Sequence, residues 1–514
     1  MTNLLATVAL GLAAVSKGGV DVGYNLLLST HNETWDETCH DISSAKLPAY
    51  VKGTFLIPSL GQFELGGYTF DGIFDPFGKL ARFTFTNDSE LCVHSRMMDS
   101  AYYNDSIAMG KPCPNLYLLD TIPPLNYTDM QKLQGPQDNL FVNSYEIGGH
   151  FRVVSDTVKT LEFDPKSLRI TGNVTWADKL DRLVLPLGSA HQLPDPQNPG
   201  CIIDVHPQTG VLHKEVIVYR ICDDKPYERV KINSYTYHYM PYFHAWGLTS
   251  RHLVLPQMHF TIDMMAVFQK GATMNTAFQP KDMGKPTTVK VVPLDGSAPI
   301  DFSVPGDIFY THSMNTFENA TSITWDFIFF GANPFVGAGR SSLSLFRNKT
   351  RRDNIKSRGI VKRLVLHLSG PLKGTHSLTT LGFENDVRGT DFPTINDNYL
   401  SKEYCYFYAN EWYHDRTSYA DMAVSKWNVC ETPATQKYFY RPNHYPSEPK
   451  FIPSGRDGAA EDEGVLIFTL LNGVDETSSL LIIDAQTFDV ILEQRLPHPV
   501  GFTTHGEFYR NLVF

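Results

Sequence analysis

One local unit recurs along this chain in related forms: an apolar strand, an aspartate, a few turn residues and a second apolar strand. It is clearest in TLEFDPKSLRITGNV (160–174), CIIDVHPQTGVLHKEV (201–216) and LLIIDAQTFDVILEQ (480–494). Asp164, Asp204 and Asp484 stand where the side-chain oxygen of an Asx-type turn can cap a hairpin. The pattern predicts a fold built mainly from β-hairpins.

Two architectures can be built from many such hairpins. Short apolar strands continue over most of the 514 residues, and few segments show a helical period. A β-propeller and a pair of β-sandwiches would both use these strands, but no Pro/Gly/Ser-rich linker separates two sandwiches. We therefore expect an all-β propeller, in which closure of the ring protects the strand edges.

The charge balance argues against one class of partner. With 55 acidic and 44 basic residues the chain has a net charge of −11, so no nucleic-acid partner is expected. The one strongly basic run, RNKTRRDNIKSRGIVKR (Arg347–Arg363), is interpreted as a solvated loop. No feature of the sequence predicts the oligomeric state.

The first residues have the pattern of a secretory signal. An apolar stretch from Leu4 to Val15 precedes small residues, although no positive charge comes before it. The alternative is a first helix or strand of the fold. Seven N-x-S/T sequons favour the signal, at Asn32, Asn87, Asn104, Asn126, Asn173, Asn319 and Asn348. We expect a signal peptide at 1–17, a single propeller domain at 18–514, and a protein that is secreted or held in the ER lumen; a cytoplasmic protein peripheral to a membrane is the alternative.

The seven cysteines are scattered and contain no C-x-x-C pair. This excludes a zinc ribbon or a thioredoxin motif and allows up to three disulfides and one free thiol.

The segment Met258–Phe278 mixes Met, Phe and Ala with little charge. Ordinary packing under a loop is one interpretation. The other is an apolar surface that makes peripheral contact with a membrane or admits an apolar ligand.

Four of the 18 histidines share a context, each at the edge of an apolar strand beside small or turn residues. They are His191 in GSAHQLPDP, His244 in YFHAWGLT, His312 in FYTHSMNTFE and His505 in GFTTHGEF. Their spacing matches no local metal motif, and hydrogen-bonded core histidines are the alternative. In a propeller, however, the innermost strands of different blades converge on one axis, so these side chains can meet at a single ion.

Several ordered motifs resemble those of the carotenoid cleavage oxygenase family, which includes the retinal pigment isomerohydrolase. Residues 47–85 (LPAYVKGTFLIPSLGQFELGGYTFDGIFDPFGKLARFTF) resemble its opening blade, HSRMMDSAYY (94–103) its R-F-x-x-S-x-x-Y, and residues 138–168 its next blade. DFPTIN (391–396) is similar to E-F-P-x-I-N, and residues 460–471 and 480–488 look like the final blade. The resemblance runs from about residue 40 to the C-terminus.

The resemblance implies a seven-bladed propeller with loop and helical insertions that cap an axial Fe(2+) site. The family's four histidine ligands lie in T-A-H-P, H-S-F-G-x-T, F-H-x-x-N-x-x-E and F-H-G-x-F, which match His191, His244, His312 and His505. Three glutamates usually orient these ligands; the matching residues here are Asp156, Asp391 and Glu448. Because two of the three are a methylene shorter, we expect either a closer backbone or an intervening water.

The function implied is that of a non-haem Fe(II) dioxygenase that splits a C=C bond of a carotenoid or apocarotenoid into two carbonyl products. Its partners would be an apolar polyene and O2, with catalysis resting on the metal and on positioning rather than on a general acid or base. Two alternatives remain: a retinoid ester isomerohydrolase, and a secreted, catalytically weak propeller that binds an apolar polyene. Four intact ligands count against the last of these.

Overall fold

The computed structural model describes residues 21–115, 119–128, 131, 135–180, 187–209, 214–239, 242–263, 273–331, 342–382 and 388–514. The expected signal peptide at 1–17 lies outside the described residues, as does the middle of the segment Met258–Phe278. Three apolar side chains of its described ends are packed inside the protein, since Met258, Phe260 and Phe278 are 1%, 1% and 4% exposed. Among the described helices, none is long and apolar enough to cross a membrane.

Seven antiparallel sheets, each with four or five strands, follow one another along the chain and form the blades of a β-propeller. Blade 1 contains β1 (Trp35–Asp41), β2 (Gly53–Gln62), β5 (Phe77–Phe85), β6 (Glu90–Met97) and β35 (Glu507–Arg510). Blade 2 contains β8 (Asn143–Ile147), β9 (His150–Val154), β10 (Thr160–Phe163) and β11 (Ile170–Asn173). Blade 3 contains β12 (Leu193–Pro194), β13 (Cys201–Thr209), β14 (Lys214–Cys222) and β15 (Lys225–Thr236).

The remaining blades repeat this arrangement. Blade 4 contains β16 (Gly247–Leu248), β17 (His252–Pro256), β20 (Thr287–Pro293) and β21 (Ile300–Val304). Blade 5 contains β22 (Phe309–Glu318), β23 (Ser322–Phe330), β24 (Gly359–His367) and β25 (His376–Thr380). Blade 6 contains β26 (Thr390–Ile395), β27 (Tyr406–Glu411), β28 (Ala423–Asn428) and β29 (Thr435–Tyr440). Blade 7 contains β30 (His444–Pro446), β31 (Lys450–Pro453), β32 (Gly464–Asn472), β33 (Thr477–Asp484) and β34 (Val490–Arg495).

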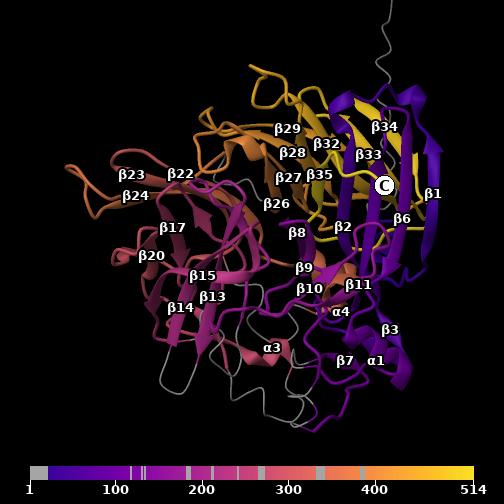
Figure 1. Ribbon diagram of the computed structural model, residues 1–514, viewed down its shortest axis with the longest axis horizontal. Helices are drawn as coiled ribbons and strands as arrows, with labels where there is room; N and C mark the ends of the chain where they lie inside the picture. Colours follow the sequence, from indigo (N-terminus) through magenta and orange to yellow (C-terminus); the bar gives the residue numbers. More distant parts are fainter. Residues whose placement is uncertain are drawn as a thin grey trace, which may run out of the picture.

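The ring closes because the last strand joins the first blade. β35 pairs antiparallel with β2, from Gly53 opposite Arg510 to Leu56 opposite Glu507. Figure 1 shows the yellow C-terminal strands beside the indigo first blade. The innermost strands β22, β26, β31, β35 and β8 contact one another in succession around the axis. This confirms the expected propeller, and it places residues from distant parts of the sequence around one centre.

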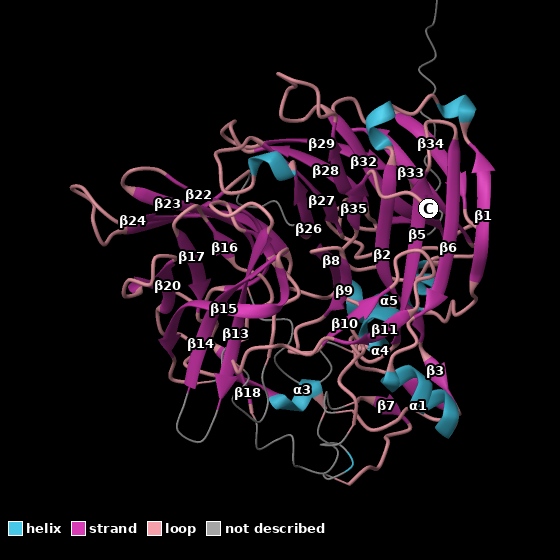
Figure 2. Ribbon diagram, in the orientation of Figure 1, coloured by secondary structure: helices cyan, strands magenta, loops and turns pink. Residues whose placement is uncertain are grey.

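Shorter elements are inserted between the blade strands and cover one end of the propeller. They are β3 (Glu64–Leu65), β4 (Tyr68–Phe70), β7 (Thr121–Ile122), β18 (Phe260–Ile262), β19 (Phe278–Pro280), α1 (Ala101–Met109), α3 (Met274–Ala277), α4 (Leu343–Arg347) and α5 (Lys349–Asp353). Figure 2 shows α1, α3, α4 and α5 on the same side of the blades. A 3₁₀ turn, η1 (Tyr24–Leu28), packs against α4. These insertions form the cap that the resemblance predicts.

Two of the three predicted Asx turns are present. Asp164 accepts hydrogen bonds from the N–H groups of Lys166 and Ser167, and Asp484 does the same for the second and third residues after it. The prediction for Asp204 is wrong, because β13 continues past it to Thr209. Asp204 is instead buried and accepts from Tyr219 Oη at 2.8 Å, and burial raises its pKa to about 7.

Three disulfides fasten neighbouring strands and turns: Cys39–Cys92 between β1 and β6, Cys201–Cys222 between β13 and β14, and Cys405–Cys430. Cys113 is buried and carries a free thiol. This is the maximum number of pairs that the seven cysteines allow.

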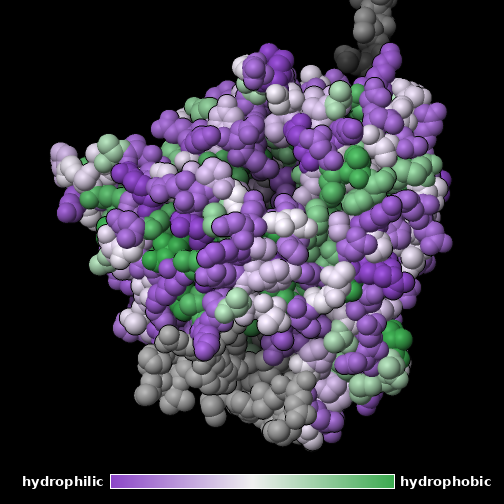
Figure 3. Space-filling view, viewed as in Figure 1, coloured by the Kyte–Doolittle hydropathy of each residue, from purple (hydrophilic) through white to green (hydrophobic). Residues whose placement is uncertain are grey.

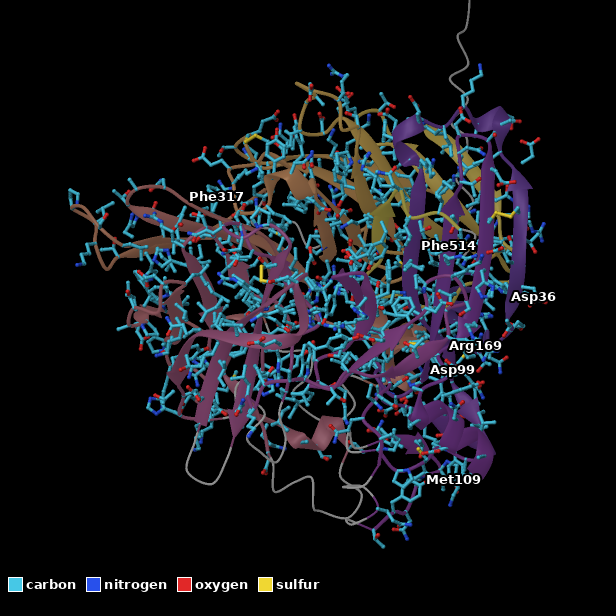
Figure 4. All side chains as sticks on the ribbon, in the orientation of Figure 1. Asp36, Asp99, Met109, Arg169, Phe317 and Phe514 are labelled. Atoms are coloured by element: carbon cyan, nitrogen blue, oxygen red, sulfur yellow. A yellow bond between two sulfur atoms is a disulfide. The ribbon has the colours of Figure 1, made fainter. Side chains whose placement is uncertain are left out.

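Polar contacts and apolar packing together hold blade 1 against blade 2. Asp99 accepts from the backbone N–H of Ile170 at 2.8 Å, and its other oxygen lies 3.6 Å from Arg169 Nη1. Figure 4 shows these two labelled side chains next to each other.

The face drawn in Figure 3 is largely hydrophilic, since the blades direct most of their large apolar side chains inward.

Closure of the ring predicts a measurable dependence on β35. A chain truncated after Gly506 loses every β2–β35 pair and exposes an unpaired strand edge, so its unfolding midpoint should fall and its aggregation should rise. A chain truncated after Leu512 keeps β35 and serves as the control. Thermal unfolding followed by circular dichroism would contradict this account if both truncations melted at the same temperature.

Candidate metal centre

The structure brings the four predicted histidines together from four blades. His191 precedes β12, His244 precedes β16, His312 lies within β22, and His505 precedes β35. One ring nitrogen of each lies within 4.8 Å of the corresponding nitrogen of the others. His244 lies at the edge of a strand, as expected, because the described residues just before Gly247 form a loop that leads into the short strand β16.

All four rings direct their Nε2 atoms at a common point. The Nε2 atom of His244 lies 3.0 Å from that of His191 and 3.1 Å from that of His312, and the Nε2 atoms of His312 and His505 are 3.2 Å apart. The planes of neighbouring rings meet at 69° to 75°, so the rings approach one another edge-on. His312 and His505 are 5% and 7% exposed, whereas His191 and His244 are half-buried.

Three carboxylates bind the opposite nitrogens of three of these rings. Asp156 Oδ2 lies 2.8 Å from Nδ1 of His244, and Asp391 Oδ1 lies 2.6 Å from Nδ1 of His312. Both oxygens of Glu448 lie close to Nδ1 of His505, at 3.0 and 3.1 Å. The two aspartates therefore contact their histidines directly, and no water needs to lie between them.

The carboxylates determine which nitrogen carries the proton. A carboxylate accepts hydrogen bonds, so Nδ1 of each of these three imidazoles donates its hydrogen and Nε2 keeps a lone pair. The Nε2 atom of His312 then lies 3.1 Å from that of His244 and 3.2 Å from that of His505, with the three lone pairs directed at one another. Lone pairs this close repel one another, and a cation between them removes the repulsion. Metal-binding histidines in proteins are held in the same way, with the second nitrogen donating to a carboxylate.

The donor set fits a divalent first-row transition metal. Imidazole nitrogen suits Fe, Zn, Cu and Ni, whereas Ca²⁺ and Mg²⁺ prefer oxygen. Metal–imidazole bonds of about 2.1 Å at right angles would place neighbouring nitrogens about 3.0 Å apart, whereas tetrahedral angles would give about 3.4 Å. The observed 3.0–3.2 Å agrees with right angles, which leave room for further ligands.

Burial and neighbouring charges keep two of the rings neutral. Burial, followed by the other three histidines, holds the pKa of His191 well below its usual range. Burial also lowers the pKa of His312, although the Asp391 carboxylate opposes this. In His505 burial again lowers the pKa, but the charge and hydrogen bond of Glu448 outweigh it and the net shift is upward. Neutral imidazole is the form that binds a metal.

The carboxylates are themselves positioned by side chains that the sequence did not single out. Tyr242 Oη donates to Asp156 Oδ2 at 2.5 Å, and Thr311 Oγ1 donates to Asp391 Oδ1 at 3.0 Å. Tyr242 comes two residues before His244 and Thr311 one residue before His312. Their proximity in sequence was a usable signal, but hydroxyl groups near histidines are too common for that signal to be specific.

Phe392 adopts a backbone conformation that is uncommon for a bulky residue. Its φ is 54°, and the register of β26 against β27 shifts between Asp391 and Thr394. The bulge allows Asp391 to bind His312 while the ring of Phe392 packs 5.0 Å from His312 and 5.5 Å from His505, between ring centroids. Strain of this kind is typical of functional sites, where the surrounding packing maintains it.

An apolar cavity of about 210 Å³ opens onto three of the histidines, His244, His312 and His505. Most of its lining is aromatic or aliphatic, and part of it comes from η1 and α4 of the cap. The lining includes Tyr24, Leu28, Phe309, Phe346, Phe392, Trp412, Tyr419 and Phe502. A long apolar molecule can therefore lie beside the Nε2 atoms with little water around it.

Fold and site together define a seven-bladed β-propeller with a carboxylate-supported cluster of four histidines at its axis. The chain belongs to the RPE65 family, because the family model described as retinal pigment epithelial membrane protein matches residues 28–510.

Individual relatives are distant but match over most of their length. Carotenoid cleavage dioxygenase 8 homolog B, chloroplastic, of Oryza sativa subsp. japonica is 23% identical over 93% of this chain and 83% of its own. Beta,beta-carotene 15,15'-dioxygenase of Gallus gallus is 22% identical over 90% and 94%. The solved structure of a mutant Synechocystis apocarotenoid oxygenase superposes with a TM-score of 0.79 at 20% identity, over 95% of this chain and 98% of that one. At this identity the structural likeness establishes a shared fold.

Removing one carboxylate charge should weaken metal binding without unfolding the protein. In Asp391→Asn the amide no longer fixes the proton on Nδ1 of His312, so affinity for Co²⁺ should fall about 10- to 100-fold. Titration of the metal-free protein with Co²⁺, followed by visible absorption, measures this directly. Asp484→Asn, the same change at a turn between β33 and β34, is the control. Equal affinities in the two variants would show that Asp391 does not orient the ligand.

Proposed function

We propose that this protein is an Fe(II)-dependent dioxygenase that cleaves a C=C double bond of a carotenoid or apocarotenoid into two carbonyl products. The observation that carries the proposal is the convergence of imidazole lone pairs on the wall of an apolar cavity. A site that holds a polar or charged group beside the histidines would place charged side chains there, whereas this cavity places aromatic rings around the part of the substrate that reacts. The names of the relatives, which are carotenoid-cleaving dioxygenases, support the same reaction class.

Each part of the site has a separate task. His191, His244, His312 and His505 would hold the iron, and Asp156, Asp391 and Glu448 would keep the Nε2 atoms of the last three available to it. Ferrous iron, when bound, supplies the redox chemistry by which O2 reacts with a double bond.

The aromatic lining of the cavity fixes the polyene in one position and excludes water. Phe392 and Trp412 contact each other across the cavity wall, with ring centroids 6.2 Å apart, and restrict where the chain of the substrate can pass. Positioning of this kind replaces an acid or base: no proton has to move for O2 and a C=C bond to give two C=O bonds.

Two other functions predict different outcomes. A retinoid ester isomerohydrolase would use the same metal ligands without consuming O2. A carrier of apolar polyenes would need the cavity but not the four imidazoles, and the carboxylate-fixed lone pairs therefore count against it.

Metal content and oxygen uptake distinguish these functions. The protein purified and reconstituted with Fe(II) should contain about one iron per chain, consume O2 with a polyene, and release carbonyl products detectable by mass spectrometry. His244→Ala should lose both the metal and the oxygen uptake. Ester hydrolysis without oxygen uptake would favour the isomerohydrolase, and polyene binding without any metal would favour the carrier.

We also propose a secretory location. Three disulfides are typical of an oxidising compartment. All seven sequon asparagines are exposed: Asn32, Asn87, Asn104, Asn126, Asn173, Asn319 and Asn348. Contact with a membrane through Met258–Phe278 remains a prediction; Met258, Phe260 and Phe278 themselves are buried.

Glycosylation tests the location. Protein made in a eukaryotic secretory system should lose mass when treated with a glycosidase specific for N-linked glycans. Replacing Asn87, at the exposed turn between β5 and β6, by Gln should remove one glycan. A chain that carries no N-linked glycan, or that stays in the cytosol, would contradict the secretory location.

A further inference from the structure

A second cavity, of about 400 Å³, adjoins the one beside the histidines. The two share five lining residues: Ile73, Thr311, Phe346, Trp412 and Tyr419. A long ligand whose middle lies beside the histidine cluster can therefore extend past these residues into the second cavity.

The second cavity differs from the first in its charge. Its wall includes Arg351, Lys356 and Arg358, all from the basic run that the sequence suggested was a solvated loop. Among the described residues that line it, Asp391 is the only carboxylate, and that carboxylate is bound to His312 and Thr311. The outer part of this cavity is thus positively charged, whereas the inner part is aromatic.

Other cations of the same run have identified partners. Arg347 donates to the carbonyl of Leu28, Lys349 and Arg352 pair with Asp21, and Arg363 pairs with Asp326. These contacts show that the four cations hold parts of the cap and of blade 5 together.

Arg351 and Lys356 behave differently. Neither forms an ion pair with any residue that the structure describes, and both side chains are exposed at the cavity. Arg358 is held in place, with its guanidinium 3.7 Å from the ring centroid of Tyr413 and a hydrogen bond of 2.9 Å to the carbonyl of Arg416. Two charges are therefore available to a ligand beside a third that is fixed in the wall.

We propose that the substrate is an amphiphilic polyene with an anionic end, a carboxylate, which Arg351 and Lys356 bind while the polyene chain lies past Trp412 beside the histidines. This rests on the proposed function and specifies its substrate class. Arginine and lysine are the side chains that recognise carboxylates, and binding at one end selects which double bond lies beside the cluster.

Binding of a matched pair of ligands tests this proposal without requiring turnover. All-trans-retinoic acid and methyl retinoate share one polyene chain, and only the acid carries a charge. Quenching of tryptophan fluorescence, to which Trp412 in the shared wall contributes, gives the affinity for each in the iron-reconstituted full chain. We expect the acid to bind about tenfold more tightly than the ester at low salt, and less so at high salt.

The variants locate the effect. Arg351→Gln and Lys356→Gln should each weaken binding of the acid about three- to tenfold and leave binding of the ester unchanged, and the double variant should bind both alike. Lys373→Gln, at an exposed turn between β24 and β25, is the control and should keep the preference. Equal binding of acid and ester by the unchanged protein, or a preference that survives in the double variant, would overturn the proposal.

The same variants separate this inference from its alternatives. An anionic group could also come from a lipid headgroup, so sedimentation with phosphatidylserine vesicles should be the same for the unchanged protein and the double variant. Loss of vesicle binding without loss of acid preference would assign the cations to a lipid surface and overturn the proposal. If the protein cleaves neutral polyenes as readily as acidic ones, the inference is refuted and the dioxygenase proposal stands. If the protein prefers the acid but consumes no O2, the dioxygenase proposal is refuted and the preference for an anionic ligand stands.

Discussion

Three hydrogen bonds between carboxylates and imidazoles determine what the centre of this molecule can do. By accepting the Nδ1 hydrogens of His244, His312 and His505, Asp156, Asp391 and Glu448 leave three lone pairs facing inward at the axis. Lone pairs at this spacing repel one another, so a metal ion bound between them stabilises the site. The propeller supplies the rigidity that this requires, because each histidine is anchored at the inner edge of a different blade.

The shortened acids show how backbone geometry compensates for side-chain length. Asp391 reaches His312 at 2.6 Å because β26 bulges next to it and Phe392 takes a φ of 54°. Tyr242 adds a hydrogen bond to Asp156, which limits the freedom of the shorter side chain. The same bulge places the ring of Phe392 in the cavity, so the support of a ligand and the shape of the substrate site depend on one local distortion. A substitution of Asp391 or of Phe392 should therefore affect both metal binding and substrate selection.

Local patterns in the sequence were sufficient for the hairpins, because the turns at Asp164 and Asp484 are set by neighbouring residues. The identities of the four histidines and three carboxylates followed from ordered motifs. Two features of the structure could not be predicted from the sequence. Asp204 looks like a turn residue, but strand pairing continues past it, and only tertiary packing decides that. The basic run at Arg347–Arg363 was interpreted as a solvated loop, whereas the fold places Arg351 and Lys356 at the wall of a cavity that is also lined by Ile73, Asp391 and Trp412 from other parts of the chain. Such long-range placement leaves no local signature.

X-ray absorption at the iron edge of the reconstituted protein tests the central claim most directly. The lone pairs that the carboxylates orient should give a first coordination sphere of nitrogen and oxygen at about 2.1–2.2 Å, with the outer scattering of four imidazole rings. Asp391→Asn should disorder one ring and reduce that outer scattering while the others remain. A spectrum dominated by carboxylate oxygen, or one with fewer than four imidazoles in the unchanged protein, would contradict the account.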